Sequence, residues 1–570
     1  MFVKVFIDLL QDNTITNRNK KAFVHMDLNI VFFTAPIGYI LRTQHQPTQT
    51  TMRHIRHIVA VLFILNFSQT LQAQQYHDQA IIDAIVQEAT ENSHLEQLGH
   101  HLMDVIGPRL VGTPQMQHAH DWAVETFESW GIEAENQQFG TWRGWERGIT
   151  HVDMIYPRVV TLEAMQLAWS PGTGEPVEGG IVIIPEVDGP DAFKEWLPNV
   201  EGKFVMISMH QPTGRPNYNW EEFATEASYE RMLADRQGQT NAWRQRIANT
   251  GYNNNQLQVA LEEAGAAGII VSNWSQGFGV NRVFGAQTRE IPTIDILLED
   301  YGMLYRLVEN GHDPVIRVNT TSQELGEVPT FNTIATIPGT EKPDEYIILS
   351  AHFDSWDGGT GATDNGTGSI TMMEVARVLK EVYPNPKRTI VVGLWGSEEQ
   401  GLNGSRAFVE DQPEIVEGLQ ALFNQDNGTG RVVNISGQGF LHSYDFMTRW
   451  LSGVPSDVRG HIETNFPGMP SGGGTDHASF VAAGAPGFSL SSLSWSYWNY
   501  TWHTNRDTYD KIVFDDLLNN VILIASLTYM ASEDPQRSSR ERRVMPINPR
   551  TGEQMEWPQQ RSPNRRGGLD

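Results

Sequence analysis

Three short apolar runs in the second half of the chain decide the fold: EYIILSAH (345–352), TIVVGLW (389–395) and LQALFNQD (419–426). The centre of each run is apolar, as expected of strands that are buried on both faces of a sheet. A helical pattern over residues 369–382 separates the first two runs. Strands that alternate with helices predict an α/β domain, with a mixed sheet covered by helices.

Acidic residues or a histidine stand at the end of each run. Because ligands of open α/β sheets bind outside the carboxyl ends of the strands, these side chains should converge at one edge. Two loops add an aspartate and a histidine, GGTGATDNGTG (358–368) and WHTNRDTYDKI (502–512). Five nitrogen and oxygen ligands suit two zinc ions that share a bridging aspartate. The candidate metal ligands are His352, Asp364, Glu399, Asp426 and His503.

The pair Glu398-Glu399 suggests how such a site would act. Two metal ions close together can activate water and polarise a carbonyl group. A carboxylate that is not a ligand must then take the proton of the water and pass it to the leaving amine. Adjacent residues point in different directions, so one glutamate can bind metal while the other faces the substrate.

Three further residues are candidates for supporting roles. Asp354 is placed to accept the ring N–H of His352, and Asp507 could do the same for His503. His477, in GGGTDHASF (472–480), could stabilise an oxyanion, although a structural hydrogen bond explains it equally well. A group of aromatic residues before His503 either lines a hydrophobic pocket or packs in the core. These are Trp495, Trp498, Tyr500 and Trp502.

The same strings resemble the successive motifs of the M28 family of dizinc exopeptidases. They are SAHFDSWDGGTGATDNGTG (350–368), GLWGSEEQGLNGSRAF (393–408), NQDNGTG (424–430), GGGTDHASF and WHTNRDTYDKI. Three further features resemble the carboxypeptidase Q branch of this family. They are GPRLVGTP (107–114), WERG (145–148) and the β-rich segment that precedes the three apolar runs. The resemblance implies a zinc-exopeptidase fold of the phosphorylase/hydrolase type, with an inserted protease-associated domain.

The resemblance also assigns roles to individual residues. It implies His352, Asp364, Glu399, Asp426 and His503 as ligands of two zinc ions per chain. Asp364 would bridge the ions, and Glu398 would be the general base. These assignments agree with the positions of the residues at the strand ends.

Composition narrows the chemistry further. The 570 residues include no cysteine, which excludes disulfides, thiol nucleophiles and thiolate zinc sites. The 41 basic and 68 acidic residues give a net charge of −27. Because nucleic-acid binding depends on Lys and Arg that neutralise phosphates, we expect a peptide substrate and no nucleic acid. A homodimer is left open.

A secretory signal is predicted at residues 52–73, with Arg53 and Arg56, an apolar run over 58–67 and a small residue at Ala73. The run is far shorter than the roughly 20 residues that span a bilayer, so no stable membrane span is expected. Because a signal should begin a chain, we interpret residues 1–51 as a mis-called extension. The expected location is secreted or periplasmic.

The pattern of apolar and polar residues changes along the rest of the chain and suggests where the domains begin and end. We expect an N-terminal part of the peptidase domain over 74–154, an insert over 155–325, and the catalytic domain over 326–532. The insert is predicted to be β-rich, with a polar helical stretch at 217–248 that could cover the cleft. Residues 533–570 have no periodic apolar face and are predicted to be a disordered tail.

The direction of cleavage is not decided by these motifs. An aminopeptidase needs acidic groups for the substrate ammonium, whereas a carboxypeptidase needs Arg, Lys or N–H donors for a carboxylate. The overall acidity favours the first and the motifs favour the second. Two alternatives are a glutaminyl cyclase-like acyl transferase, which uses one zinc, and a receptor that keeps the peptidase scaffold without catalysis.

Overall fold

The three apolar runs form neighbouring parallel strands in the computed structural model. They are β11 (Lys342–His352), β12 (Arg388–Trp395) and β13 (Leu419–Asn424), with β11 in the middle. β16 (Gly487–Ser492) continues the sheet in parallel beside β13, and β10 (Val315–Ile337) lies antiparallel beside β12. The mixed α/β sheet predicted from the sequence is confirmed.

The structure describes residues 77–569. The predicted extension over 1–51 and the predicted signal peptide over 52–73 lie outside this range. None of the helices in the described part of the chain is long and apolar enough to cross a membrane.

Helices cover both faces of the central sheet, as alternate residues of β11 demonstrate. Ile347 and Leu349 pack into one core, and Ile348 between them packs into another. On the first face lie α3 (Gln79–Glu91), α4 (Leu95–His100), α5 (Pro114–Ser129), α11 (Thr367–Val382), α14 (Ser443–Gly453) and α18 (Phe514–Glu533). On the second face lie α12 (Asn403–Asp411), α13 (Pro413–Gly418) and α16 (His477–Ala482).

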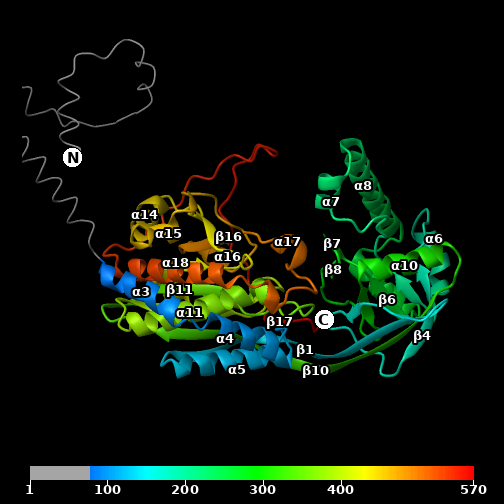
Figure 1. Ribbon diagram of the computed structural model, residues 1–570, viewed down its shortest axis with the longest axis horizontal. Helices are drawn as coiled ribbons and strands as arrows, with labels where there is room; N and C mark the ends of the chain where they lie inside the picture. Colours follow the sequence, from blue (N-terminus) through cyan, green and yellow to red (C-terminus); the bar gives the residue numbers. More distant parts are fainter. Residues whose placement is uncertain (1–76, 570) are drawn as a thin grey trace, which may run out of the picture. The chain divides into compact units, whose positions relative to one another are not determined.

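Two long strands connect this domain to the insert. β1 (Glu133–Tyr156) runs antiparallel to β10 from Glu133 opposite Thr336 to Tyr156 opposite Val315, and Figure 1 shows them side by side. The N-terminal end of β10 pairs with β4 (Val177–Ile183), a strand of the insert sheet. The insert therefore begins and ends on a continuous ribbon of sheet rather than on loose linkers.

The insert contains more helix than the sequence predicted. Its strands β4, β5 (Phe204–Met206), β6 (Gly268–Val271) and β9 (Thr293–Ile296) are parallel neighbours. Parallel neighbours need crossover connections, which are usually helical. The helices of the insert are α6 (Pro190–Trp196), α7 (Asn217–Phe223), α8 (Glu226–Asn249), α9 (Asn254–Glu263) and α10 (Leu298–Glu309). The polar stretch 217–248 is helical, as expected.

The C-terminal residues contradict the prediction of a disordered tail. Phe440 and Arg542 form an antiparallel bridge, and β17 (Arg566–Gly567) pairs in parallel with β1. Between them, the Trp557 ring lies 5.5 Å from the Phe440 ring, and its indole N–H donates to Val481 O at 2.8 Å. Separate anchors hold this extended segment to the domain, and periodicity detects only segments with a continuous apolar face.

Replacing Trp557 with Ala should release the C-terminal segment while the domain stays folded. The change removes a ring contact and a hydrogen bond to Val481, so we expect a local loss of about 2–3 kcal/mol. Hydrogen exchange of residues 555–568 should accelerate, whereas exchange of β11 should not change. Unaltered exchange in the tail would contradict its anchoring by this ring.

Candidate metal centre

The five predicted ligands come together as two groups that share one residue. Suitable atoms of His352, Asp364 and Asp426 lie within 4.8 Å of one another, and so do those of Asp364, Glu399 and His503. Asp364 Oδ1 is 3.4 Å from His352 Nε2, and Asp364 Oδ2 is 3.4 Å from His503 Nε2. The two oxygens of one carboxylate thus face two different groups.

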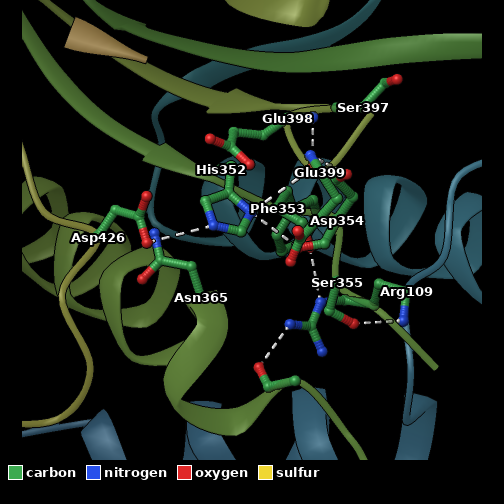
Figure 2. Close-up of polar contacts among 12 residues, drawn as sticks. Arg109, His352, Phe353, Asp354, Ser355, Asn365, Ser397, Glu398, Glu399 and Asp426 are labelled. Carbon is green, nitrogen blue, oxygen red and sulfur yellow. Dashed lines mark hydrogen bonds and ion pairs between the residues drawn. The ribbon is translucent and has the colours of Figure 1, made fainter. Parts of the chain in front are cut away.

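The distances to the remaining two acids complete the arrangement. Asp426 Oδ1 lies 3.4 Å from His352 Nε2, and Figure 2 shows this contact as a dashed line. Glu399 Oε2 lies 2.9 Å from His503 Nε2. Each group therefore contains one histidine, one carboxylate of its own and the shared Asp364.

The sheet topology explains why these residues meet. His352 is the last residue of β11, Glu399 follows β12, and Asp426 follows β13. Since the three strands are parallel, their carboxyl ends lie at the same edge. Asp364 reaches the edge on the loop before α11, and His503 on a segment that pairs with the insert through an Arg282–Thr504 bridge.

The buried acids fit a divalent cation. Among residues 77–569, Asp364 Oδ2 and Glu399 Oε1 are buried and accept no hydrogen bond. Burial, together with the neighbouring carboxylate of Asp364, raises the pKa of Glu399 well above its usual range. A buried carboxylate is normally paired or binds a metal, and a cation there favours its ionised form. A set of histidine and carboxylate ligands without cysteine is suited to zinc.

Glu398 belongs to neither group of ligand atoms, but it lines the same cavity. This cavity of about 480 Å³ is bounded by both glutamates and by Asp364, Asp426 and His503. The backbone N–H groups of Glu398 and Glu399 donate to the two carboxylate oxygens of Asp354, at 3.0 and 3.2 Å. Burial raises the pKa of Glu398 well above its usual range, and nearby Asp426 adds to this effect.

Asp354 differs in part from its predicted role. His352 Nδ1 lies 2.9 Å from the backbone oxygen of Asp354 and 3.6 Å from its carboxylate. The backbone carbonyl therefore sets the ring orientation, and the carboxylate holds the turn that carries the two glutamates. The Asp354 side chain still supports the site, but mainly by holding the turn that follows β12.

Asp507 does not contact the ring of His503 as predicted. Its carboxylate accepts the backbone N–H groups of Thr363 and Asp364, at 2.8 and 3.0 Å. Burial and the neighbouring charge of Asp364 together raise the pKa of Asp507 to about 7. Asp507 therefore fixes the backbone of the shared aspartate, whereas the Nδ1 atom of His503 has no hydrogen-bond partner within residues 77–569.

Tyr497, and not His477, lies beside the cavity in which a substrate would bind. His477 is buried in α16 and is not among the residues that line the cavity. Tyr497 lines the cavity, and burial together with the nearby charge of Asp364 raises the pKa of its hydroxyl well above the usual range. Tyr497 was not among the predicted residues, although it stands between Trp495 and Trp498 of the predicted aromatic group. Trp498 and Trp502 of that group also line the cavity.

Arg109 is a second residue whose role the sequence did not reveal. It is fully buried, and its guanidinium donates to the backbone oxygens of Phe353, Gly107, Thr360 and Gly361 at 2.7, 3.1, 2.8 and 2.8 Å. Figure 2 shows it below the strand end that carries His352. Burial lowers the pKa of Arg109 to about 10. This arginine ties the loop before Asp364 to the end of β11.

The fold and the paired ligand groups define a metallopeptidase, and comparisons with known proteins agree. Residues 332–528 match the family described as Peptidase family M28. Carboxypeptidase Q of Bos taurus is 26% identical over 465 residues, which are 81% of this chain and 87% of the relative. Carboxypeptidase Q of Homo sapiens is 27% identical over 431 residues, 75% and 83% respectively. Residues 332–528 thus match peptidase family M28, and the chain is similar to carboxypeptidase Q over most of its length.

Solved structures share the fold. A Peptidase M28 precursor from Shewanella amazonensis SB2B has a TM-score of 0.60 at 24% identity, with 82% of this chain and 99% of that chain covered. BSAP, a zinc aminopeptidase from Bacillus subtilis, has a TM-score of 0.51 at 17% identity, with 79% and 97% covered. These two structures show that the chain shares their fold.

Proposed function

We propose that the chain is an exopeptidase that uses two zinc ions to hydrolyse the terminal peptide bond of dipeptides or oligopeptides. The observation that carries the proposal is the division of Asp364 between the two groups, with one oxygen 3.4 Å from His352 and the other 3.4 Å from His503. His352 and Asp426 would hold one ion, and Glu399 and His503 the other.

Glu398 is the proposed general base. Zinc, when bound, acts as a Lewis acid that polarises the substrate carbonyl and acidifies a water molecule. Glu398 accepts the proton of the attacking water as the water oxygen bonds to the carbonyl carbon. When the C–N bond breaks, Glu398 gives that proton to the leaving amine. The Tyr497 hydroxyl is available to donate to the oxygen on which negative charge develops.

The insert and the N-terminal segment complete the proposal. We infer that the insert is a protease-associated domain that supports one wall of the site, because Phe284 packs edge-on at 5.4 Å against the His503 ring. Export to the periplasm or the exterior is proposed from the signal-like sequence at residues 52–73. Hydrophobic lining by Trp498 and Trp502 favours apolar substrate side chains.

Metal content and turnover test the function together. The purified chain loaded with zinc should bind two ions, hydrolyse dipeptides, lose this activity on chelation and regain it with zinc. Elemental analysis beside a dipeptide panel makes the measurement. One ion per chain with cyclisation of N-terminal glutamine would instead identify an acyl transferase. Two ions without turnover of any peptide would favour the non-catalytic scaffold.

A further inference from the structure

Two arginines line the active-site cavity at the side of Glu398. Arg406 comes from α12, and Arg561 comes from the C-terminal segment that was expected to be disordered. Both also line an adjoining cavity of about 430 Å³, together with Gln559, Gln560 and Ser562. The C-terminal segment is therefore part of the wall of the candidate active site.

Neither guanidinium, that of Arg406 or that of Arg561, forms an ion pair within the described residues 77–569. Arg565, four residues after Arg561, is by contrast paired: it contacts Asp411 at 2.7 Å and Glu410 at 3.3 Å. Two unpaired guanidinium groups in one cavity provide donors and charge for an anionic ligand.

The two charges lie close to each other and to the proposed base. Burial lowers the pKa of Arg406, and the positive charge of Arg561 lowers it further, whereas Asp476 and Glu398 oppose the change. The repulsion between the arginines is unfavourable without an anion. An anion bound between them would relieve it, on the side of the cavity where Glu398 acts.

Anchors on both sides hold Arg561 in this position. Trp557 is fixed four residues before it by the Phe440 ring and the Val481 carbonyl. Three residues after it, the Asn564 N–H donates to Asn403 Oδ1 at 2.8 Å. A segment fixed at both ends loses little further entropy when Arg561 binds a ligand.

We propose that Arg406 and Arg561 bind the free α-carboxylate of the residue that leaves, so that the enzyme cleaves dipeptides and C-terminal residues. This inference rests on the proposed function, in which Glu398 gives its proton to the leaving amine. The α-carboxylate is attached to the carbon next to that nitrogen, so it must lie on the Glu398 side of the cavity. An α-ammonium at the same place would be repelled.

The test compares one substrate with and without its carboxylate. Ala-Phe and its C-terminal amide are hydrolysed by the zinc-loaded full chain and by the Arg561→Gln and Arg406→Gln variants. Loss of a hydrogen bond to a charged group should lower kcat/KM for Ala-Phe roughly 10- to 100-fold in each variant. The amide should already be poor for the unchanged chain and should change less than about threefold in the variants.

Arg550→Gln is the matched control, because Arg550 is an exposed arginine of the same segment outside both cavities. It should leave both substrates unaffected. If the ratio of Ala-Phe to amide hydrolysis is the same in the unchanged chain and in the two cavity variants, the arginines do not read the carboxylate and the inference is overturned.

A binding measurement separates this inference from the proposed function. Calorimetry compares phenylalanine with phenylalaninol, which lacks the carboxylate and has no bond to hydrolyse. Weaker binding of phenylalanine to Arg561→Gln than to the unchanged chain, with equal binding of phenylalaninol, supports the carboxylate site even if no peptide is hydrolysed. Equal binding of phenylalanine to both proteins overturns it. Absence of all peptide hydrolysis alone would overturn the function.

Discussion

The Glu398→Gln variant should bind as much zinc as the unchanged chain and hydrolyse dipeptides about 10²- to 10⁴-fold more slowly. Glu398 is in neither group of ligand atoms, yet it lines the cavity that Asp364 and Asp426 also line. Glutamine keeps the size of the side chain but cannot accept and return a proton. The loss should therefore fall on kcat, with KM nearly unchanged.

Steady-state kinetics with a dipeptide, beside elemental analysis of zinc, checks this expectation. Glu414→Gln is a suitable control, since Glu414 is an exposed carboxylate at the start of the nearby α13. It should behave as the unchanged chain. Turnover by Glu398→Gln within about threefold of normal would exclude Glu398 as the base. Loss of one zinc ion in that variant would make Glu398 a ligand instead.

The core of the site was predictable because parallel strands impose it. Once the runs ending at His352 and Asp426 are assigned to one sheet, their carboxyl ends must lie at one edge. Asp364 and His503 are different, since they reach the site on loops whose course no periodicity describes. Their inclusion depended on the pattern of loop motifs and on the family resemblance.

Contacts behind the site were harder to predict for a physical reason. Spacing in the sequence suggested that Asp507 supports His503, four residues away. The carboxylate instead accepts two backbone N–H groups beside Asp364, more than 100 residues distant along the chain. Buried backbone N–H groups need hydrogen-bond acceptors, and a nearby carboxylate can supply them. Which carboxylate does so depends on the path of the loop in the folded chain.

The net charge of the chain differs in sign from the charges of the two arginines that line the cavity. A net charge of −27 suggested a cleft for an ammonium group, whereas the cavity contains Arg406 and Arg561. Net charge bears on solubility and long-range attraction, whereas the charges that line a cavity act directly on a ligand bound there. The assignment was hidden because one of the two arginines belongs to the segment without a periodic pattern.

Replacing Arg109 with Met should weaken zinc binding and lower stability together. The substitution leaves buried carbonyl groups of Phe353, Thr360 and Gly361 without donors, and each lost bond exposes a desolvation cost of about 1–3 kcal/mol. Partial relaxation should reduce the total to about 3–5 kcal/mol. A shift in the thermal or urea midpoint measures this loss.

Zinc affinity distinguishes the role of Arg109 from that of a buried arginine that only stabilises the fold. Arg388 is also fully buried, and it donates to the backbone oxygens of Ala531, Ser532 and Asp534 at 3.0, 2.8 and 2.7 Å, away from the metal centre. Arg388→Met should destabilise the chain by a similar amount and leave zinc affinity unchanged. Arg109→Met should lower that affinity about 10- to 100-fold, the usual cost of losing a group that orients a metal ligand. Equal zinc affinities in the two variants would mean that Arg109 stabilises the fold without setting the position of Asp364.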